Sequence, residues 1–259
     1  MIQAPTPALF IGHGSPMNAI EANRFTRAWA ERFAALPRPQ AILCVSAHWE
    51  TDGPKVTAME RPRTIHDFGG FPAELFAVDY PAPGSPALAE HLQQLVPEIN
   101  LDHTWGLDHG AWSVLRPMLP AADLPVVQLS LDRRRSPREH PLLAQRLRPL
   151  RQEGVLVLGS GNLVHNLGRI LWEDRAHGWA EAFDQLLAER ISSGSLEDLL
   201  DPLALSPDAG LSLPSLEHYL PLLYVLGVRD PGEPIGFFNT EVTLGAIAMR
   251  SLQVGAGAG

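Results

Sequence analysis

Four short apolar runs, each ending close to Gly, Ser or His, constrain the fold of this chain more than any other feature. The runs occupy residues 7–14, 41–49, 125–131 and 154–162. Such runs are typical of strands that are buried on both faces of a sheet. Helix-like stretches with spaced apolar residues alternate with them, at 21–36, 86–96, 111–119, 138–152, 176–192 and 217–226. This alternation predicts an α/β fold, with one central, mostly parallel or mixed sheet flanked by helices.

The length of the chain favours a single domain. With 259 residues, of which 45% are hydrophobic and 19% charged, the sequence has the composition of a soluble globular protein with one large core. We expect residues 1–254 to form this domain and residues 255–259, GAGAG, to be a flexible tail. Residues 243–254 fit either a closing strand or a helix. Residues 193–215, rich in Ser, Pro and Asp, are expected to run over the surface.

Composition excludes several classes of protein. The net charge of −9 at pH 7 has the wrong sign for binding a phosphate backbone, so nucleic acid is not an expected partner. We expect no membrane span and no signal peptide, because no run of about 18 apolar residues occurs and the N-terminus lacks a basic start. Cys44 is the single cysteine, so an intrachain disulfide is excluded and a buried thiol in the reducing cytoplasm is expected.

The ten histidines are the residues most informative about function. His13 and His48 close predicted strands, and His165 lies four residues past the glycines of VLVLGSGNLVHN. Ligands of open α/β sheets bind outside the carboxyl ends of the strands, and neighbouring strands lie about 4.8 Å apart. Imidazoles from two or three strand ends could therefore reach one metal ion. The alternative is that each histidine caps a turn or pairs with a buried carbonyl group.

Two further histidines stand at expected helix starts. Glu217 and His218 begin the apolar run EHYLPLLYVLG, and adjacent helical residues point about 100° apart. Only one of the two is therefore expected to bind an ion directly, with the other supporting it. His109 lies between Asp108 and Gly110 in WGLDHGAW, where a role in the site competes with that of an exposed turn residue.

The other five histidines carry less information. His66 lies in the loop TIHDFGGFP, whose glycine and aromatic residues fit a pocket wall and a plain loop equally well. The remaining four stand in contexts without a partner pattern. We expect these four on the surface: His91, His103, His140 and His177.

Eight ordered motifs, spread over nearly the whole chain, resemble one family. They are GHGSPMN at 12–18, LPRPQAILCVSAHW at 36–49, TIHDFGGFP at 64–72, YPAPGSP at 80–86, LDHGAW at 107–112, PVVQLSLD at 125–132, GSGNLVHNL at 159–167 and EHYLPLLYVLG at 217–227. Together they resemble the 4,5-DOPA-extradiol-dioxygenase-type proteins of the class III extradiol ring-cleavage dioxygenase superfamily. The resemblance implies that residues 1–254 form a single catalytic α/β domain with one divalent metal ion. It also implies Zn²⁺ in the purified protein and Fe²⁺ for ring cleavage.

Carried over to this sequence, the resemblance implies a site made of histidines. It makes His13, His48 and His218 metal ligands. It places His165 at the same ion, either as a fourth ligand of a zinc-bound resting form or as the acid/base above the substrate. His109 is similar to the second active-site histidine of the family.

One departure from the better-studied ring-cleaving members affects the metal. Those members use two histidines and one glutamate, whereas here the candidate carboxylate, Glu217, immediately precedes His218. The resemblance favours the histidine, and the sequence leaves the choice open. If His218 is the ligand, the ion has no carboxylate ligand, which suits zinc better than a two-histidine, one-carboxylate iron site. Glu217 and Asp108 are expected to contact the metal-binding histidines without binding the ion themselves.

The implied reaction cleaves a catechol such as L-DOPA next to its vicinal diol and consumes O₂. The diol and O₂ need open coordination positions at the metal. The protein is therefore expected to occupy only about three positions of the octahedron. A histidine with a pKa near 6.5 serves as base and acid near neutral pH, and His165 is the candidate, with His109 orienting substrate or O₂. His66, Phe68 and Phe71 are expected to shape the substrate pocket.

Two other functions compete with ring cleavage. A zinc hydrolase would use the lowered pKa of a zinc-bound water, with Glu217 or Asp108 as the base. A non-enzymatic metal-binding protein on the same scaffold is the second alternative. The sequence is equally compatible with a monomer and with a homo-oligomer.

Overall fold

Four parallel strands form the centre of the main sheet. They correspond to the four apolar runs and are β1 (Ala8–Gly12), β2 (Ala41–Thr51), β7 (Val126–Asp132) and β8 (Val155–Gly161). They stand in the order β7-β2-β8-β1, and each neighbouring pair among them is parallel. All residues of β1, β7 and β8 are buried, as expected for strands covered on both faces. The computed structural model describes residues 4–258, so residues 1–3 and Gly259 lie outside the description.

Shorter strands extend this centre at both edges. β12 (Ser251–Val254) pairs antiparallel with β1, and β9 (Ile235–Phe238) pairs antiparallel with β12. At the other edge, β3 (Lys55–Thr57) pairs antiparallel with β7 and parallel with β5 (Asn100–Asp102). The result is a mixed eight-stranded sheet, which confirms the predicted fold class. Two small ladders are β4 (Arg63–Thr64) with β6 (Gly106–Leu107) and β10 (Val242–Thr243) with β11 (Ile247–Ala248).

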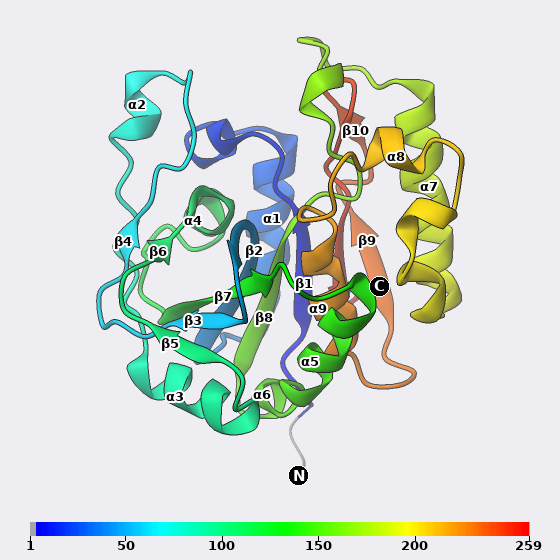
Figure 1. Cartoon of the computed structure of the whole chain (residues 1–259). Coiled ribbons are helices and arrows are strands. Elements are labelled where there is room, and N and C mark those ends of the chain that lie inside the picture. The colour runs from blue at the N-terminus through cyan, green and yellow to red at the C-terminus, as the bar shows by residue number, and fades with distance from the viewer. Residues whose placement is uncertain (1–3, 259) are drawn as a thin grey trace.

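Helices cover both faces of the sheet (Figure 1). α1 and α4 pack on the face that carries Leu9 and Ile11, whereas α3, α5 and α9 pack on the face that carries Ala8 and Phe10; α7 joins the second core from the side, against β10, β11 and α8. Because successive side chains of a strand point to opposite faces, each apolar run contributes to two cores. The long helices are α1 (Arg24–Ala34), α3 (Pro86–Leu95), α4 (His109–Met118), α5 (His140–Arg146), α7 (Gly178–Ser193) and α9 (Leu220–Gly227).

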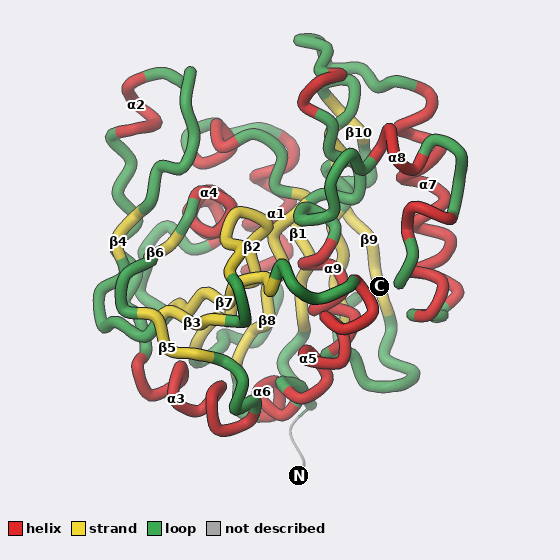
Figure 2. Tube along the Cα trace, in the orientation of Figure 1, coloured by secondary structure: helices red, strands yellow, loops and turns green. Residues whose placement is uncertain are grey.

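Loops and short helical turns connect these elements (Figure 2). The short turns are η1 (Pro16–Ala19), α2 (Ala73–Phe76), η2 (Pro137–Glu139), α6 (Pro149–Gln152), η3 (Leu167–Arg169), η4 (Glu197–Leu199), η5 (Pro202–Ala204) and α8 (Ala209–Ser212). The segment 193–215 is exposed over most of its length, and Leu199, Ala209 and Leu213 anchor it in the core.

The structure corrects three details of the sequence analysis. The helix expected at 138–152 is divided into η2, α5 and α6, each with a proline in its first turn, because a proline interrupts a helix that precedes it. α9 begins at Leu220, so Glu217 and His218 lie in the turn before the helix. His140 was expected on the surface but is fully buried, with Nδ1 3.2 Å from Oη of Tyr224. The burial of Cys44 is confirmed.

The carboxyl ends of β1, β8 and β2 lie side by side and set the place of the candidate site. His13 directly follows β1, and its N–H donates to the carbonyl oxygen of Gly161 in β8 at 3.0 Å. Gly14 adopts a φ of 62°, which side-chain-bearing residues rarely adopt, so the chain turns directly after His13. His48 lies near the end of β2, where the register with β7 shifts.

A close approach of two backbones joins the turn before α9 to β8. The N–H of Asn162 donates to the carbonyl oxygen of His218 at 2.8 Å. A methyl group at Gly161 would overlap that same carbonyl oxygen, so glycine is needed beside the turn that carries His218. The position of His218 therefore depends on this contact as well as on α9.

The end of the described chain lies against the rest of the fold. The carbonyl oxygen of Gly257 accepts a hydrogen bond from Nη1 of Arg32 at 2.9 Å, and Ala258 is buried beside Gly236. The flexibility of residues 255–259 and the domain boundary at 254 stay predictions. Within the described part of the chain, no helix combines the length and hydropathy needed to cross a bilayer.

We expect Gly161→Ala to destabilise the protein by about 1–3 kcal/mol, because the added methyl group must push β8 and the turn that carries His218 apart. The loss is measured as a lower midpoint of urea denaturation at an unchanged m value. Gly178→Ala is the matched control: nothing lies within 4 Å of a Cβ at this first residue of α7, so stability should stay equal or rise. Equal midpoints for the two variants would contradict the close packing at Gly161.

Candidate metal centre and active site

Five histidines converge on one cavity at the carboxyl ends of the central strands. The cavity has a volume of about 370 Å³. All five were placed in the site by the sequence analysis, although they come from distant segments of the chain. They are His13, His48, His109, His165 and His218.

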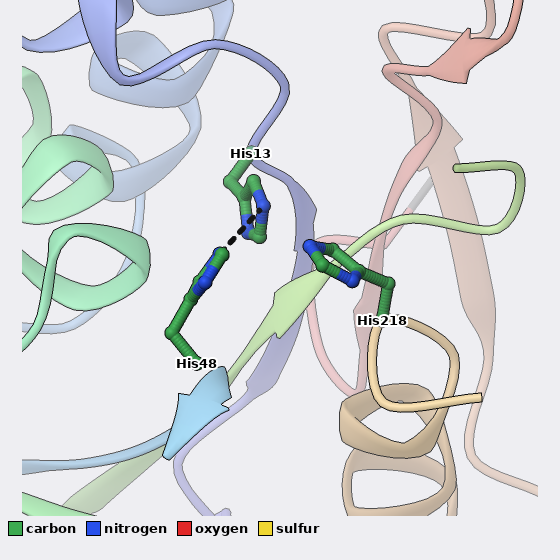
Figure 3. Close-up of side chains that lie close together, drawn as sticks. All are labelled: His13, His48 and His218. Atoms are coloured by element: carbon green, nitrogen blue, oxygen red, sulfur yellow. Dashed lines mark hydrogen bonds between the residues drawn. The ribbon is translucent and has the colours of Figure 1, made fainter. Parts of the chain in front are cut away.

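Three of these imidazoles form a triangle (Figure 3). The ring centroids lie 5.1 Å apart for His13 and His48, 5.2 Å for His13 and His218, and 5.0 Å for His48 and His218. One ring nitrogen of each residue lies within 4.8 Å of the other two, and the Nε2 atoms of His13 and His48 are 3.4 Å apart. Three imidazole nitrogens at this separation could hold one metal ion. We call this group the histidine triangle.

Hydrogen bonds behind two of the rings determine which nitrogen faces the centre. Oγ of Ser160 donates to the carbonyl oxygen of Gly110 at 2.6 Å, so it accepts from Nδ1–H of His13 at 3.0 Å. Nδ1–H of His218 donates to Oε1 of Glu217 at 2.9 Å. In both rings Nε2 then carries no proton and faces the triangle: Nε2 of His218 has no partner among the described residues, and Nε2 of His13 lies 3.4 Å from Nε2 of His48. Metal-binding histidines are usually oriented in this way.

The Nε2 atom of His218 is buried and lacks a hydrogen-bond partner in the described structure. A buried polar atom without a partner costs free energy, and a metal ion at the histidine triangle would satisfy it. The residues therefore fit a divalent ion. Glu217 contacts the other side of the His218 ring and is absent from the described lining of the cavity. Glu217 thus engages the Nδ1 edge of His218, and it also forms, with His165 and His218, a further group that could hold a metal ion.

Burial keeps His13, His48, His165 and His218 neutral at pH 7. Loss of hydration, followed by repulsion from the neighbouring imidazoles, lowers the pKa of His13 and of His218 well below 6.5. The same two causes lower the pKa of His48 to about 3. Burial also lowers the pKa of His165 to about 4. Neutral imidazole is the form that binds metals and accepts protons, so these four rings are ready for either role.

His165 lies beside the histidine triangle. Its ring stacks on the ring of His218, with 3.5 Å between the centroids and 8° between the planes. The N–H of His165 donates to the carbonyl oxygen of Ser212 at 3.0 Å, which fixes this part of the chain against α8. This place suits both roles that the sequence left open, a fourth ligand and an acid/base.

Asp67 is a site residue that the sequence analysis missed. Its Oδ1 accepts from the backbone N–H and from Nδ1–H of His109, at 3.0 and 2.9 Å. Its Oδ2 lies 3.8 Å from Nδ1 of His48, and the three side chains form a second group that could hold a metal ion. Burial acts to raise the pKa of Asp67, but the hydrogen bonds and charge of His109 outweigh it, so the pKa is lowered overall. The sequence signal was the position of Asp67 beside His66 in TIHDFGGFP.

Asp108 lies beneath the site and does not line the cavity. Its carboxylate caps α4 by accepting from the N–H of Ala111 at 3.1 Å, and it also accepts from Oγ of Ser46 at 2.7 Å and from Nε2 of Gln128. Burial raises the pKa of Asp108 to about 6. These contacts fix the start of α4, and with it His109, which favours a supporting role.

Two walls of apolar side chains flank the histidines. Phe68 and Phe71 form one, which we call the phenylalanine wall. His66 does not line the cavity, because its Nε2 pairs with the carbonyl oxygen of Val78 at 3.0 Å and its ring packs against Phe68. The sequence analysis did not assign the apolar residues of the opposite wall to the pocket, although Leu167 ends the motif GSGNLVHNL. This tryptophan wall consists of Leu167, Ile170, Trp172, Leu244 and Ile247.

Comparison with known proteins identifies the family. Residues 5–240 match the family described as the catalytic LigB subunit of aromatic ring-opening dioxygenase. The chain belongs to this dioxygenase family. Membership confirms the resemblance found in the sequence and the prediction of an extradiol aromatic ring-opening dioxygenase, in preference to the hydrolase and the non-enzymatic protein. An aromatic substrate and O₂ follow from the family reaction.

Relatives in this dioxygenase family are similar over most of the chain. The 4,5-DOPA dioxygenase extradiol of Escherichia coli (strain K12) is 48% identical over 258 residues, which is 96% of this chain and 94% of that protein. The protein of the same name from Beta vulgaris is 42% identical over 228 residues, or 84% of this chain and 85% of that protein. The crystal structure of an uncharacterized protein from Escherichia coli K12 has a TM-score of 0.84 and 43% identity, and the match covers 96% of this chain and 100% of that chain.

Buried neutral histidines determine how the stability of the metal-free protein depends on pH. Burial lowers the pKa of five of them: His13, His48, His140, His165 and His218. In the unfolded chain these groups take up protons below about pH 6.5, while in the folded chain they stay neutral, so the free energy of unfolding falls as the pH drops. We expect a loss on the order of 1 kcal/mol per histidine between about pH 6.5 and 5.5.

Urea denaturation at a series of pH values, in the presence of a chelator, measures this dependence. A free energy of unfolding that stays constant from pH 6.5 to 5.5 would show that the imidazoles are not held neutral by burial.

Proposed function

We propose that the protein is a metal-dependent extradiol dioxygenase that opens the ring of a catechol such as L-DOPA, inserting O₂ next to the vicinal diol. The observation that carries this proposal is the histidine triangle, with its buried and unpartnered Nε2 of His218, in a cavity between two apolar walls. The family supplies the ring-opening reaction, and the names of two relatives support DOPA as the example.

One divalent ion per chain is proposed to bind the Nε2 atoms of His13, His48 and His218. When bound, the ion supplies a Lewis acid for the catechol oxygens and, as Fe²⁺, the redox chemistry that O₂ requires. Three imidazoles without a carboxylate also suit Zn²⁺, which we propose for the protein as purified. The second group, with Asp67, is less suited, because Oδ1 of Asp67 already accepts two hydrogen bonds from His109.

The side chains around the triangle are proposed to handle protons and position the substrate. His165 takes a proton from a catechol hydroxyl, since burial keeps its ring neutral at pH 7, and it returns the proton as an acid during ring opening. Asp67 holds the Nδ1 proton of His109, so the Nε2 edge of His109 is left to orient a substrate hydroxyl or O₂. Phe68 and Phe71 stack on the aromatic ring and exclude water.

Alanine variants separate the ligands from the acid/base. His165→Ala should retain the metal and abolish turnover, because His165 lies beside the triangle. His13→Ala and His48→Ala should lose the metal, because each removes one of three donors. Metal content per chain and oxygen uptake are measured for each variant, with His103→Ala, at an exposed histidine outside the cavity, as the control that keeps both. Equal metal loss in the three site variants would sink this division of roles.

Reconstitution tests the reaction itself. The metal-free protein is loaded anaerobically with Fe²⁺ or with Zn²⁺, and oxygen uptake and visible absorbance are followed with L-DOPA and simpler catechols. We expect oxygen uptake and a new yellow semialdehyde absorbance band for the Fe²⁺-loaded protein and neither for the Zn²⁺-loaded protein. Absence of uptake with every catechol and both metals would overturn the proposed ring cleavage.

A further inference from the structure

Large apolar side chains are exposed at the mouth of the cavity. Leu167 and Trp172, both in the tryptophan wall, are 64% and 87% exposed. Phe71 of the phenylalanine wall is partly exposed on the opposite side. Isolated exposed hydrophobic residues are common, but several that line one cavity favour an apolar ligand between them.

Positive charge is missing from the lining that the structure describes. Asp67 is the acidic residue of this lining, and no Lys or Arg of residues 4–258 belongs to it. Arg24 lines a neighbouring pocket that shares Trp172, but its guanidinium is already bound to Asp174 and Glu241, at 2.9 and 2.7 Å. An anionic group in the cavity would lose water without gaining a basic partner, which is costly.

The shape of a catechol determines which of its substituents contacts the apolar part of the described lining, which has no basic side chain. In the proposed function, the vicinal diol faces the histidine triangle. A substituent at ring position 4 points away from the diol, so it lies between the two walls and away from the proposed ion. A carboxylate attached directly to the ring therefore lies among apolar side chains, in a lining whose described residues offer it Asp67 but no basic partner. The carboxylate of L-DOPA is separated from the ring by two carbons and reaches the water outside.

We propose that this cavity selects catechols by the charge of the atom group attached directly to the ring, accepting uncharged substituents and rejecting a carboxylate. The inference rests on the proposed function and narrows its substrate class. The residues that carry it are the apolar Leu167 and Trp172 on one side, Phe71 on the other, and the acidic Asp67 in the same lining, bound to His109.

Three catechols of nearly equal size test the selection. They carry a methyl, a carboxamide or a carboxylate group at the same position: 4-methylcatechol, 3,4-dihydroxybenzamide and 3,4-dihydroxybenzoate. Dissociation constants for the metal-loaded protein are measured anaerobically by calorimetry, and kcat/KM by oxygen uptake. We expect the benzoate to bind at least tenfold more weakly than both others. The benzamide separates charge from electron withdrawal, because it withdraws electrons from the ring but carries no charge.

A basic side chain on the tryptophan wall should reverse the preference. Leu167→Arg places a guanidinium at an exposed position of the lining, so it should improve benzoate binding at least tenfold relative to 4-methylcatechol. Leu142→Arg is the matched control, since Leu142 is 57% exposed on α5 and outside the cavity, and it should leave the ratio unchanged.

The outcomes distinguish this inference from the proposed function. Benzoate binding as tight as that of 4-methylcatechol, with no response to Leu167→Arg, would overturn the charge selection while leaving ring cleavage intact. If none of the three catechols drives oxygen uptake but the order of dissociation constants is as expected, ring cleavage fails and the charge selection stands.

Discussion

Parallel pairing of β1, β8 and β2 is the constraint on which the rest of the structure depends. Because the carboxyl ends of parallel strands meet at one edge of a sheet, His13 and His48 reach the same place from positions 35 residues apart. His218, the third residue of the histidine triangle, is positioned in a different way. A backbone hydrogen bond from Asn162, beside the bare Gly161, holds the turn that carries His218 against β8.

Three imidazoles of the site are held by a supporting side chain at one of their two ring nitrogens. Ser160 and Glu217 engage the Nδ1 edges of His13 and His218, and Asp67 does the same for His109. A buried ring satisfied on both edges would be a structural element of the core, whereas a ring satisfied on one edge has a free nitrogen for a ligand. The supporting residues therefore determine which histidines keep a ring nitrogen that can bind a ligand or exchange a proton.

The sequence predicts what is encoded locally. Short apolar runs are sufficient to predict the four central strands, and their last residues indicate His13 and His48 as neighbours. Helix geometry predicted that only one of Glu217 and His218 binds an ion directly and left open which one. Both residues in fact lie in a turn before α9, where the ring of His218 bonds to the carboxylate beside it. Asp67 and the tryptophan wall enter the site through contacts between distant segments, which a single sequence does not reveal.

If an ion binds the histidine triangle as proposed, the unpartnered Nε2 of His218 makes the stability of the chain depend on the metal supply. An ion that binds only the folded protein adds a stabilisation that grows with the logarithm of its free concentration, about 2.7 kcal/mol at a hundred times its dissociation constant. Without the ion, the cluster of buried neutral imidazoles remains a weak point, and proteases act on the unfolded fraction. Metal starvation would then lower the abundance of the enzyme as well as the activity of each copy.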